Sequence, residues 1–508
     1  MLDLLIVTAP FTYTFGPSLA PALLKACATK NQIASMTWDI SADFNHHYQT
    51  NESYNSLVAW MNSPELTITA DEYQWYQHIV IAYAQTIVNR YCPKNLAVSL
   101  LTQNSQRFVE DLCYHVKSIN PGIKILLGGS GLDIFQYAYQ AKWFELMLYS
   151  GLADTVILGE GEYALPRVMK QNLFGIVKES QLTNAQLSQL PIPDYDDYDF
   201  SLYTSYTQSF WNPTDHVKKE QDLIFLITTS KGCVKDCSFC DVGKIWNKFR
   251  YRGAESVANE IITLHKKYNA SYFSFTDNLI NGGMKIFHQI NTILSEQIPN
   301  TIRYEGQMIC RSKRDMPEKH YQAMALAGCD SVSIGIESGS ETVRMHMRKG
   351  SSQEDIYYTT EMLTKYNIKQ KWFIVVGYPT ETDDDWQQTM SLIEYWLPRT
   401  NNLLTIDPSS TYLLLDGTPM TGTDEYQDLK LEKNTVRGYS QFAWTCGINT
   451  SNTFDVRCHR FLELCAYLLE YDQSKYLHLS QKISTTKKQL SWYQNEPKLK
   501  KVFSLSVN

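Results

Sequence analysis

Short apolar runs alternate with helical patterns along most of this chain of 508 residues, and this alternation restricts its fold more than any other feature. Strands and helices in alternation predict a parallel sheet that is covered by helices on both faces, which is a doubly wound domain. In the N-terminal part we expect strands at Leu4–Val7, Ala97–Leu101, Ile123–Leu127 and Thr155–Leu158, with helices at Pro17–Thr29 and Arg107–Ile119.

A second series of alternating elements follows with a longer period. Six strands separated by helices predict a partial barrel, whose active site lies at the carboxyl ends of its strands. The expected helices include Ala254–Tyr268, Glu318–Ala327 and Glu354–Tyr366. The expected strands are Leu223–Thr229, Tyr272–Thr276, Arg303–Ile309, Ser331–Ile336, Trp372–Val376 and Thr411–Leu415.

The two series are separated by the segment Leu190–Asp199, whose prolines and acidic residues suit neither helix nor strand. A chain of this length also exceeds what one core usually holds. We expect a mostly helical C-terminal region with an amphipathic helix near Val456–Tyr471, which caps the site or recognises substrate. The predicted divisions are a doubly wound domain at 1–175, a linker at 176–219, a partial barrel at 220–420 and the C-terminal region at 421–508.

Small residues follow three of the N-terminal strands, at Ser99–Ser105, Gly128–Gly131 and Gly159–Glu162. Ligands of doubly wound sheets bind beyond the carboxyl ends of the strands, and small residues let the backbone approach a large flat ligand closely. Glycines after strands are also ordinary turn residues. The pattern alone therefore leaves both interpretations open.

Cys233, Cys237 and Cys240 follow directly on a predicted barrel strand, at intervals of four and three residues. Thiolates are the soft ligands that iron–sulfur clusters require, and one short loop can bring three of them to one cluster. Three ligands would leave one iron open to a substrate or cofactor.

A structural zinc site is the alternative for these cysteines. Zinc would require a fourth Cys or His at a suitable distance. The distant thiols, such as Cys310 and Cys329, belong to predicted barrel elements, so the iron–sulfur interpretation is favoured.

Charge and composition exclude several classes of protein. The formal net charge of −7 gives no basis for broad nucleic-acid binding. No apolar run is long enough for a membrane helix, and Met1–Pro10 resembles a strand more than a signal peptide. Eleven cysteines are too few for a disulfide scaffold, so we expect a cytoplasmic protein with free thiols.

Cys-x3-Cys-x2-Cys with Phe239 before the last cysteine resembles the signature of the radical S-adenosylmethionine superfamily. The similarity extends over roughly residues 1–420 and is greatest to the branch that has a cobalamin-binding domain. Its further motifs are Arg250–Glu260, Phe275–Leu279, Gly335–Glu341, Met347–Gly350, Gly377–Glu381 and Leu415–Pro419.

This resemblance implies which residues meet S-adenosylmethionine. By position, Asp277 and Asn278 would contact its amino group. Arg311 would bind its carboxylate, since a guanidinium suits a planar bidentate contact. Alternatively, Arg311 forms an ordinary ion pair at the rim of the barrel.

Four further positions are implied to surround the nucleoside. Glu337 and Ser338 resemble residues near the ribose, whereas Phe239 and Tyr378 would flank the adenine. Glu337 could instead be a helix N-terminal charge, and Tyr378 a simple packing residue.

The N-terminal domain resembles the cobalamin-binding domain of that branch. One motif is missing, because no Asp-x-His-x-x-Gly follows the first strand, and His46 and His47 lie in the wrong context to replace it. We therefore expect cobalamin without a histidine ligand from the protein; a vestigial domain without cofactor is the alternative. The implied cofactor residues are Ser99, Thr102, Gly128, Gly129, Gly159, Glu160 and Gly161.

The resemblance implies a cobalamin-dependent radical enzyme, most simply a C-methyltransferase. A 4Fe-4S cluster would supply an electron to S-adenosylmethionine, the resulting 5′-deoxyadenosyl radical would abstract hydrogen from an unactivated carbon, and methylcobalamin would supply the methyl group. An external donor such as flavodoxin or ferredoxin would reduce the cluster, and the substrate would be a small molecule or a peptide. The alternatives are methylthiolation, a radical rearrangement and non-catalytic cofactor sensing.

Overall fold

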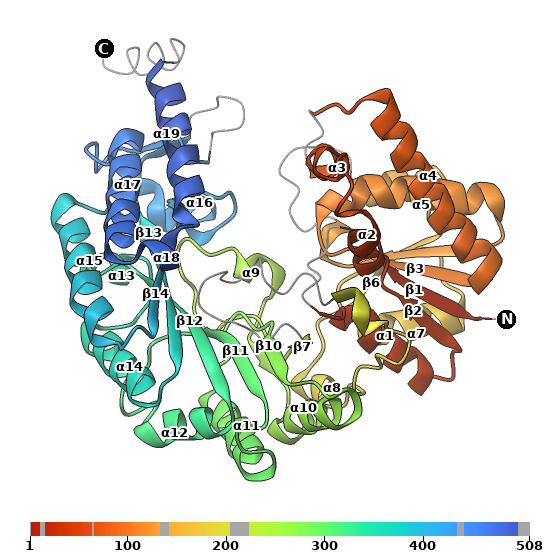
Figure 1. The fold of residues 1–508 in the computed structure, drawn as a ribbon, viewed down its shortest axis with the longest axis horizontal. Coiled ribbons are helices and arrows are strands. Elements are labelled where there is room, and N and C mark those ends of the chain that lie inside the picture. Colours follow the sequence, from red (N-terminus) through yellow and green to blue (C-terminus); the bar gives the residue numbers. More distant parts are fainter. Residues whose placement is uncertain are drawn as a thin grey trace. The chain divides into compact units, whose positions relative to one another are not determined.

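The computed structural model of the chain describes residues 2–10, 16–62, 66–132, 142–203, 223–433 and 441–495. The elements follow one another from red to blue in Figure 1. By their internal contacts the residues form two compact units. The first comprises residues 1–211 with 218–227 and 259–273, and the second comprises the rest.

A six-stranded parallel sheet forms the centre of the first unit. Its strands are β1 (Leu4–Thr8), β2 (Ser35–Trp38), β3 (Asn95–Ser99), β4 (Lys124–Gly128), β5 (Thr155–Leu158) and β6 (Gly175–Lys178). Their order is β2-β1-β3-β4-β5-β6, which reverses direction between β1 and β3, where doubly wound sheets bind ligands. The predicted doubly wound fold is confirmed, with β2 and β6 as additional strands.

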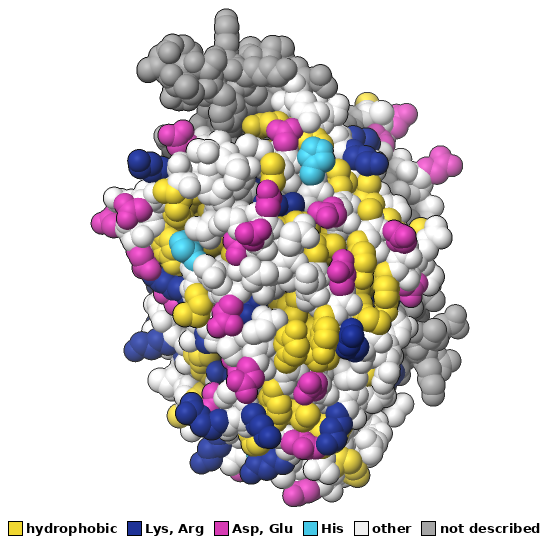
Figure 2. Space-filling model, turned by 90° about the vertical axis from the view of Figure 1, so that its left-hand side faces the viewer, with side chains coloured by type: hydrophobic (Ala, Val, Ile, Leu, Met, Phe, Trp, Pro, Cys, Tyr) yellow, Lys and Arg dark blue, Asp and Glu magenta, His cyan; other side chains and the backbone are white. Residues whose placement is uncertain are grey.

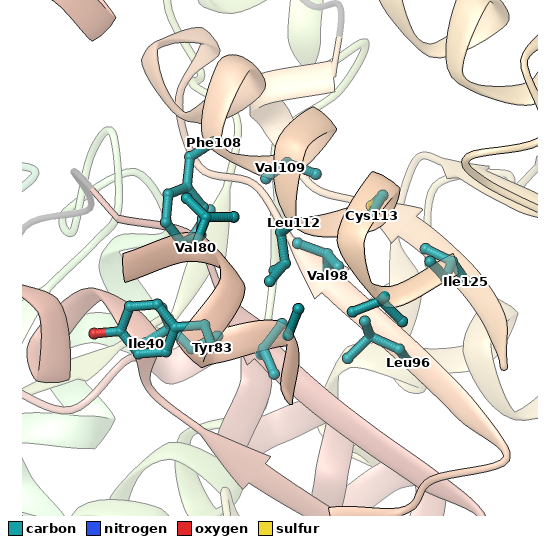
Figure 3. Close-up of a cluster of buried hydrophobic side chains, with 14 of the residues drawn as sticks. Ile40, Val80, Tyr83, Leu96, Val98, Phe108, Val109, Leu112, Cys113 and Ile125 are labelled. Carbon is teal, nitrogen blue, oxygen red and sulfur yellow. The ribbon is translucent and has the colours of Figure 1, made fainter. Parts of the chain in front are cut away.

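Helices cover both faces of this sheet. On one face, α1 (Leu19–Lys30) and α7 (Gly161–Gln171) pack against apolar side chains of the strands. On the other face, Leu96 and Val98 belong to one buried apolar cluster with Phe108 and Leu112 of α5 (Gln106–Ile119) (Figure 3). Strands buried on both faces explain why the sequence of β1 is a continuous apolar run. The other helices are α2 (Ile40–Tyr48), α3 (Tyr54–Asn62), α4 (Ala70–Thr86), α6 (Trp143–Tyr149) and α8 (Asn184–Ser188).

A second six-stranded sheet follows, and its strands stand in the order of the sequence. They are β7 (Ile224–Ile227), β10 (Tyr272–Phe275), β11 (Arg303–Met308), β12 (Cys329–Glu337), β13 (Lys369–Val376) and β14 (Leu404–Thr411). β11 to β14 pair in parallel. The partial barrel is confirmed, but the sixth strand ends at Thr411, where the sequence predicted it to begin. Pro408 obscured this strand, and a proline is tolerated there because β14 is an edge strand.

Helices alternate with these strands and continue into the C-terminal region. In that region α17 (Phe454–Tyr471) packs on β13 and β14, and the predicted helical character is confirmed. The helices of the barrel are α9 (Val242–Ile245), α10 (Ala254–Tyr268), α11 (Met284–Gln297), α12 (Glu318–Leu326), α13 (Glu341–His346), α14 (Gln353–Lys365), α15 (Asp383–Trp396) and α16 (Pro419–Gly422). The elements that remain are α18 (Gln473–Tyr476), α19 (Leu479–Asn495) and the hairpin strands β8 (Ser230–Lys231), β9 (Arg250–Tyr251), β15 (Leu431–Lys433) and β16 (Trp444–Cys446).

The acidic segment before the barrel is bound to the first unit through its described part, which ends at Tyr203. Asp197 lies 2.6 Å from the buried ammonium group of Lys25 and accepts a hydrogen bond from the Thr37 amide. The hydroxyl group of Tyr203 donates to Asp39 at 2.7 Å. These contacts fasten residues 194–203 along α1 and the end of β2.

No helix in the described ranges is both long and apolar enough to cross a membrane. On the face drawn in Figure 2, acidic and basic side chains are intermixed. This mixture agrees with a sequence that has 46 basic and 53 acidic residues.

Candidate active site

The three cysteines lie in residues 232–249, here called the cysteine loop, which the two-residue strands β8 and β9 close at its base. Gly232 begins the loop with a φ of +86°, and a Cβ atom there would lie 2.7 Å from the Lys248 carbonyl oxygen. A glycine is therefore required for the loop to leave β8 in this direction.

The thiols of the loop are close enough to influence one another. Burial raises the pKa of Cys237 to about 11, and the charges of Cys240 and Cys233 raise it further. Burial also raises the pKa of Cys240. Metal binding would have to displace these protons, and three neighbouring thiolates are the donor set that suits an iron–sulfur cluster. Among the residues that the structure describes, no three His, Cys, Asp or Glu side chains converge as ligands of a single metal ion.

Asp277 fastens the start of the cysteine loop to the end of β10. Its buried carboxylate accepts hydrogen bonds from the amide and hydroxyl groups of Thr229, at 2.9 and 2.6 Å, and from the hydroxyl group of Ser230. Burial raises the pKa of Asp277, and these hydrogen bonds counteract that effect. Its contact with S-adenosylmethionine stays a prediction, as does that of the neighbouring Asn278, which is exposed.

Ser238 fastens the middle of the loop, between Cys237 and Cys240. Its amide donates to the Met347 carbonyl at 3.0 Å, and its carbonyl accepts from the Met420 amide at 2.9 Å. Its hydroxyl group lies 2.7 Å from that of Tyr378. Tyr378 is completely buried, so its observed role is to hold the loop. Phe239 is half-buried in the same apolar cluster, and the adenine contacts predicted for both aromatic residues are untested.

A tight turn at residues 347–350 lies against the cysteine loop. Arg348 has a φ of +56° and pairs with Asp236 of the loop at 2.8 Å. A Cβ atom on Gly350 would lie 3.0 Å from the Lys235 ammonium group. The Met347–Gly350 motif thus supports the loop at Lys235, Asp236 and Ser238, away from the contacts of Asp277 with Thr229 and Ser230.

Glu337 ends β12 in a strained backbone conformation. Its φ is +66°, and the Ser338 amide donates to the Ile336 carbonyl, which defines a γ-turn centred on Glu337. A glutamate in this conformation costs roughly 1–3 kcal/mol. Its carboxylate lies 2.7 Å from the ammonium group of Lys349, to which the sequence assigned no role. Burial acts to lower the pKa of Lys349, but the charge and hydrogen bond of Glu337, together with the charges of Cys237 and Cys310, outweigh it and the pKa is raised.

Ser338 is also buried, and its groups are engaged within the barrel. Its hydroxyl lies 3.3 Å from that of Thr389, and its carbonyl accepts from Arg344 at 2.7 Å. Its predicted position near a ribose stays a prediction.

Arg311 combines a fixed position with unused hydrogen-bonding capacity. One terminal nitrogen donates to the Asn281 carbonyl at 2.9 Å, whereas Nε is buried without a partner. Burial lowers the pKa of Arg311, and the charges of Asp315 and of the nearby Cys233 counteract this. A buried, unpaired guanidinium nitrogen beside the cysteine loop fits an anionic ligand.

In the first unit the loops after β3 and β4 are joined to each other. The Leu100 amide donates to Gly128 at 2.8 Å, and a Cβ atom on Gly129 would lie 2.1 Å from the Leu100 carbonyl oxygen. Gly129 is therefore needed for contact between the loops. The prediction that it approaches a cofactor is not tested by this contact, nor is the role of Ser99, the last residue of β3.

The loop after β5 is likewise held by the protein. Gly159 has a φ of +106°, and its Cβ atom would lie 2.7 Å from the Glu179 carbonyl oxygen. Glu160 is buried and accepts a hydrogen bond from the Leu182 amide. Gly161 begins α7, close to Leu24. These residues build the carboxyl edge of the sheet.

Thr102 differs from its neighbours, because its hydroxyl oxygen is buried and has no hydrogen-bond partner. It lies in the loop after β3, beside the point where the strand order reverses. Ser105 of the same loop donates to the Pro10 carbonyl, which follows β1, at 2.6 Å. An unsatisfied hydroxyl at this edge fits a polar ligand group.

Comparison with known proteins identifies the barrel. Residues 227–393 match the model of the Radical SAM superfamily. This match spans β10 to β13 and the cysteine loop, and the identification made from the sequence is confirmed. The barrel is therefore a radical S-adenosylmethionine domain.

Solved structures of low sequence identity share the fold over both units. The cobalamin-dependent S-adenosylmethionine radical enzyme OxsB, with aqua-cobalamin bound, matches with a TM-score of 0.61, 13% identity and coverage of 99% of this chain and 75% of that chain. The radical S-adenosylmethionine methyltransferase TsrM from Kitasatospora setae, with cobalamin and a [4Fe-4S] cluster bound, matches with a TM-score of 0.51, 12% identity and coverage of 86% and 78%.

A curated relative is an uncharacterized methyltransferase of Pyrococcus horikoshii. It is 25% identical over 298 residues, which are 54% of this chain and 58% of the relative. The chain thus spans little more than half the length of this relative.

Proposed function

We propose that the chain is a cobalamin-dependent radical S-adenosylmethionine enzyme that transfers a methyl group to a carbon atom of a small molecule or peptide. The observation that carries this proposal is the cysteine loop, which contains three neighbouring thiols and is fastened through Asp277 and Ser238 within a radical S-adenosylmethionine domain. The names of the relatives support methyl transfer.

Cys233, Cys237 and Cys240 would hold a 4Fe-4S cluster with one iron free of protein ligands. Arg311 would bind the carboxylate of S-adenosylmethionine through its unpaired Nε. When bound, the cluster would supply the electron that cleaves S-adenosylmethionine, and cobalamin would carry the methyl group. The reducing electron would come from an external donor such as flavodoxin or ferredoxin.

Cobalamin would bind at the carboxyl edge of the first sheet, near the reversal of strand order. The unpaired Thr102 hydroxyl supports a polar contact there. Gly129 and Gly159 support it indirectly, because their positive φ angles shape the loops of this edge. Since the sequence lacks the Asp-x-His-x-x-Gly motif, no protein histidine would ligate the cobalt.

Anaerobic reconstitution tests the cluster. The chain should retain about four irons and cleave S-adenosylmethionine to 5′-deoxyadenosine. Replacing any one of the three cysteines by Ala should abolish cleavage, whereas Cys92→Ala, at an exposed thiol of the first unit, should not. Stoichiometric zinc without charge-transfer absorption would refute the cluster.

Loading with hydroxocobalamin and S-adenosylmethionine carrying a labelled methyl group tests the proposed methyl transfer. A product that carries the labelled methyl group supports the proposal. Conversion of the substrate to a product without the label supports a radical rearrangement. Methylthiolation would require a second cluster and about eight irons. In the structure Cys27, Cys92 and Cys113 lie at separate elements, so they do not form the ligand set of such a second cluster. Cofactor binding without any product would indicate a sensor.

A further inference from the structure

Lys349 and Glu337 form a buried ion pair inside the barrel. The ammonium nitrogen lies 2.7 Å from the carboxylate oxygen, and the two residues are only 8% and 7% exposed. Because water is largely excluded there, salt would screen these charges far less than it screens charges on the surface.

The pair lies beside the thiols of the cysteine loop. Lys349 follows Arg348, whose carbonyl oxygen is 4.0 Å from the Cys237 sulfur, and Met347, whose carbonyl accepts from the Ser238 amide. The charges of Lys349 and Cys237 influence each other's pKa, which agrees with this proximity. Lys349 is thus a fixed cation next to a predicted cluster ligand.

The surrounding backbone is adapted to the pair at a cost to stability. A Cβ atom on Gly335 would lie 2.1 Å from the Glu337 carboxylate oxygen and 2.5 Å from the Lys349 ammonium nitrogen. Glu337 itself adopts a φ of +66°. Buried ion pairs rarely stabilise a fold more than apolar residues of similar size do. A contribution to folding therefore does not account for this arrangement.

We propose that the fixed positive charge of Lys349 raises the reduction potential of the cluster held by the cysteine loop. This inference rests on the proposed function. Thiolates and sulfides give the site a negative charge, and reduction adds one more electron to it. A nearby cation in a medium of low dielectric constant stabilises the reduced form. Glu337 would hold the ammonium group in place and partly balance its charge.

Redox titration of the reconstituted full chain without S-adenosylmethionine, followed by electron paramagnetic resonance, tests the role of Lys349. Lys349→Met should make the potential more negative, with about a tenfold lower ratio of reduced to oxidised cluster at a fixed applied potential, or about 59 mV for one electron. Lys349→Arg keeps the charge and should stay near the wild-type potential. The double variant Lys349→Met with Glu337→Gln should have a reduction potential closer to that of the wild type, because both charges of the pair are then removed.

Lys365→Met provides a matched control. Lys365 pairs with Glu318 at 2.6 Å, but both side chains are about half exposed on α14 and α12. This variant should leave the potential unchanged.

Each outcome bears on a different statement. A wild-type chain that assembles no cluster overturns the proposed function together with this inference. If Lys349→Met has the wild-type iron content and the wild-type potential, this inference alone is overturned. The same holds if Lys349→Arg shifts the potential as much as Lys349→Met does, because the shift would then follow packing and not charge.

Discussion

The hydroxyl groups of Tyr378 and Ser238 lie 2.7 Å apart, which joins the loop after β13 to the cysteine loop. The backbone of Tyr378 is held in turn by the C-terminal region, because the side-chain Nδ2 of Asn452 donates to its carbonyl at 2.7 Å. Arg460 of α17 pairs with Glu381 at 2.9 Å. A series of contacts therefore connects α17 to Ser238, which directly follows the predicted cluster ligand Cys237.

Tyr378→Phe should weaken the attachment of the cysteine loop. The loss of a buried hydrogen bond costs about 0.5–1.5 kcal/mol, so a reconstituted cluster should lose iron to a chelator several-fold faster. The rate of iron loss can be followed by absorbance. Tyr412→Phe is the control, because Tyr412 packs on the Tyr378 ring while its own hydroxyl faces the Met420 sulfur. Equal rates in the two variants would contradict the role of the Tyr378 hydroxyl.

Arg311→Ala should lower the affinity for S-adenosylmethionine by more than tenfold. The loss of one charge-assisted interaction costs roughly 1.5–3 kcal/mol, and tenfold corresponds to about 1.4 kcal/mol. Equilibrium binding measures the affinity, while the iron and cobalamin contents should stay as in the wild type. Arg314→Ala is the matched control, since that side chain is 90% exposed. An unchanged affinity would refute the carboxylate contact, although not the identification of residues 227–393 as a radical S-adenosylmethionine domain.

Thr102→Val should weaken cobalamin binding without destabilising the protein. The Thr102 hydroxyl has no partner in the protein, so its removal leaves the free energy of unfolding unchanged or higher. If it meets cobalamin, the affinity should fall by about fivefold, or roughly 1 kcal/mol. Spectroscopic titration with hydroxocobalamin and urea unfolding measure the two effects.

Ser105→Ala is the comparison for Thr102→Val. Ser105 donates a hydrogen bond to Pro10, so its replacement should cost about 1 kcal/mol of stability. A bulky residue at Gly129 is a poorer test, because it would displace the Leu100 backbone before it met any ligand. Wild-type cobalamin affinity in Thr102→Val would refute the proposed contact.

Periodicity predicted the order of the central elements because buried parallel strands are continuous apolar runs. α10 and β5 have the predicted bounds, whereas β2 and β6 were missed because they lie at the edges of their sheet and are only partly buried. Pro408 and Asp407 disguised β14, and Tyr412–Leu415 resembled a strand more closely than the true one did. Patterns of this kind identify strands buried on both faces better than edge strands.

The cysteine loop was recognisable because its ligands are close together in the sequence. The residues that hold it, such as Tyr378 and Lys349, lie more than a hundred positions away, and no local pattern predicts that they meet it. The same holds for Asp197 and Lys25, which turn a predicted linker into a fastened segment. Sequence motifs thus indicated which loops belong to the site, but not which side chains support them.

His288 and His320 form a contact between α11 and α12 that we expect to weaken at acidic pH. Their rings stack with centroids 4.0 Å apart, and the Nδ1 atom of each is buried without a partner. Burial lowers the pKa of His320 to about 4, with further contributions from His288 and Lys319, and burial also lowers the pKa of His288. The folded state therefore favours neutral rings, whereas the unfolded chain takes up protons below a pH of about 6.5.

The sign of the pH effect follows from this difference. Above pH 6.5 both states are neutral and the pair has no effect, but as the pH falls towards 4 the unfolded state binds more protons and stability decreases. Each pH unit would cost up to about 1.4 kcal/mol, and partial exposure reduces the total at pH 5 to about 1 kcal/mol.

His320→Phe keeps the stacked ring and removes the titration, so it should protect α11 and α12 at pH 5 relative to the wild type but not at pH 7.5. Hydrogen exchange, corrected for intrinsic rates, measures this protection. His459→Phe, at an exposed site on α17, is the control, and a pH-independent difference between His320→Phe and the wild type would show that packing, not protonation, governs this contact.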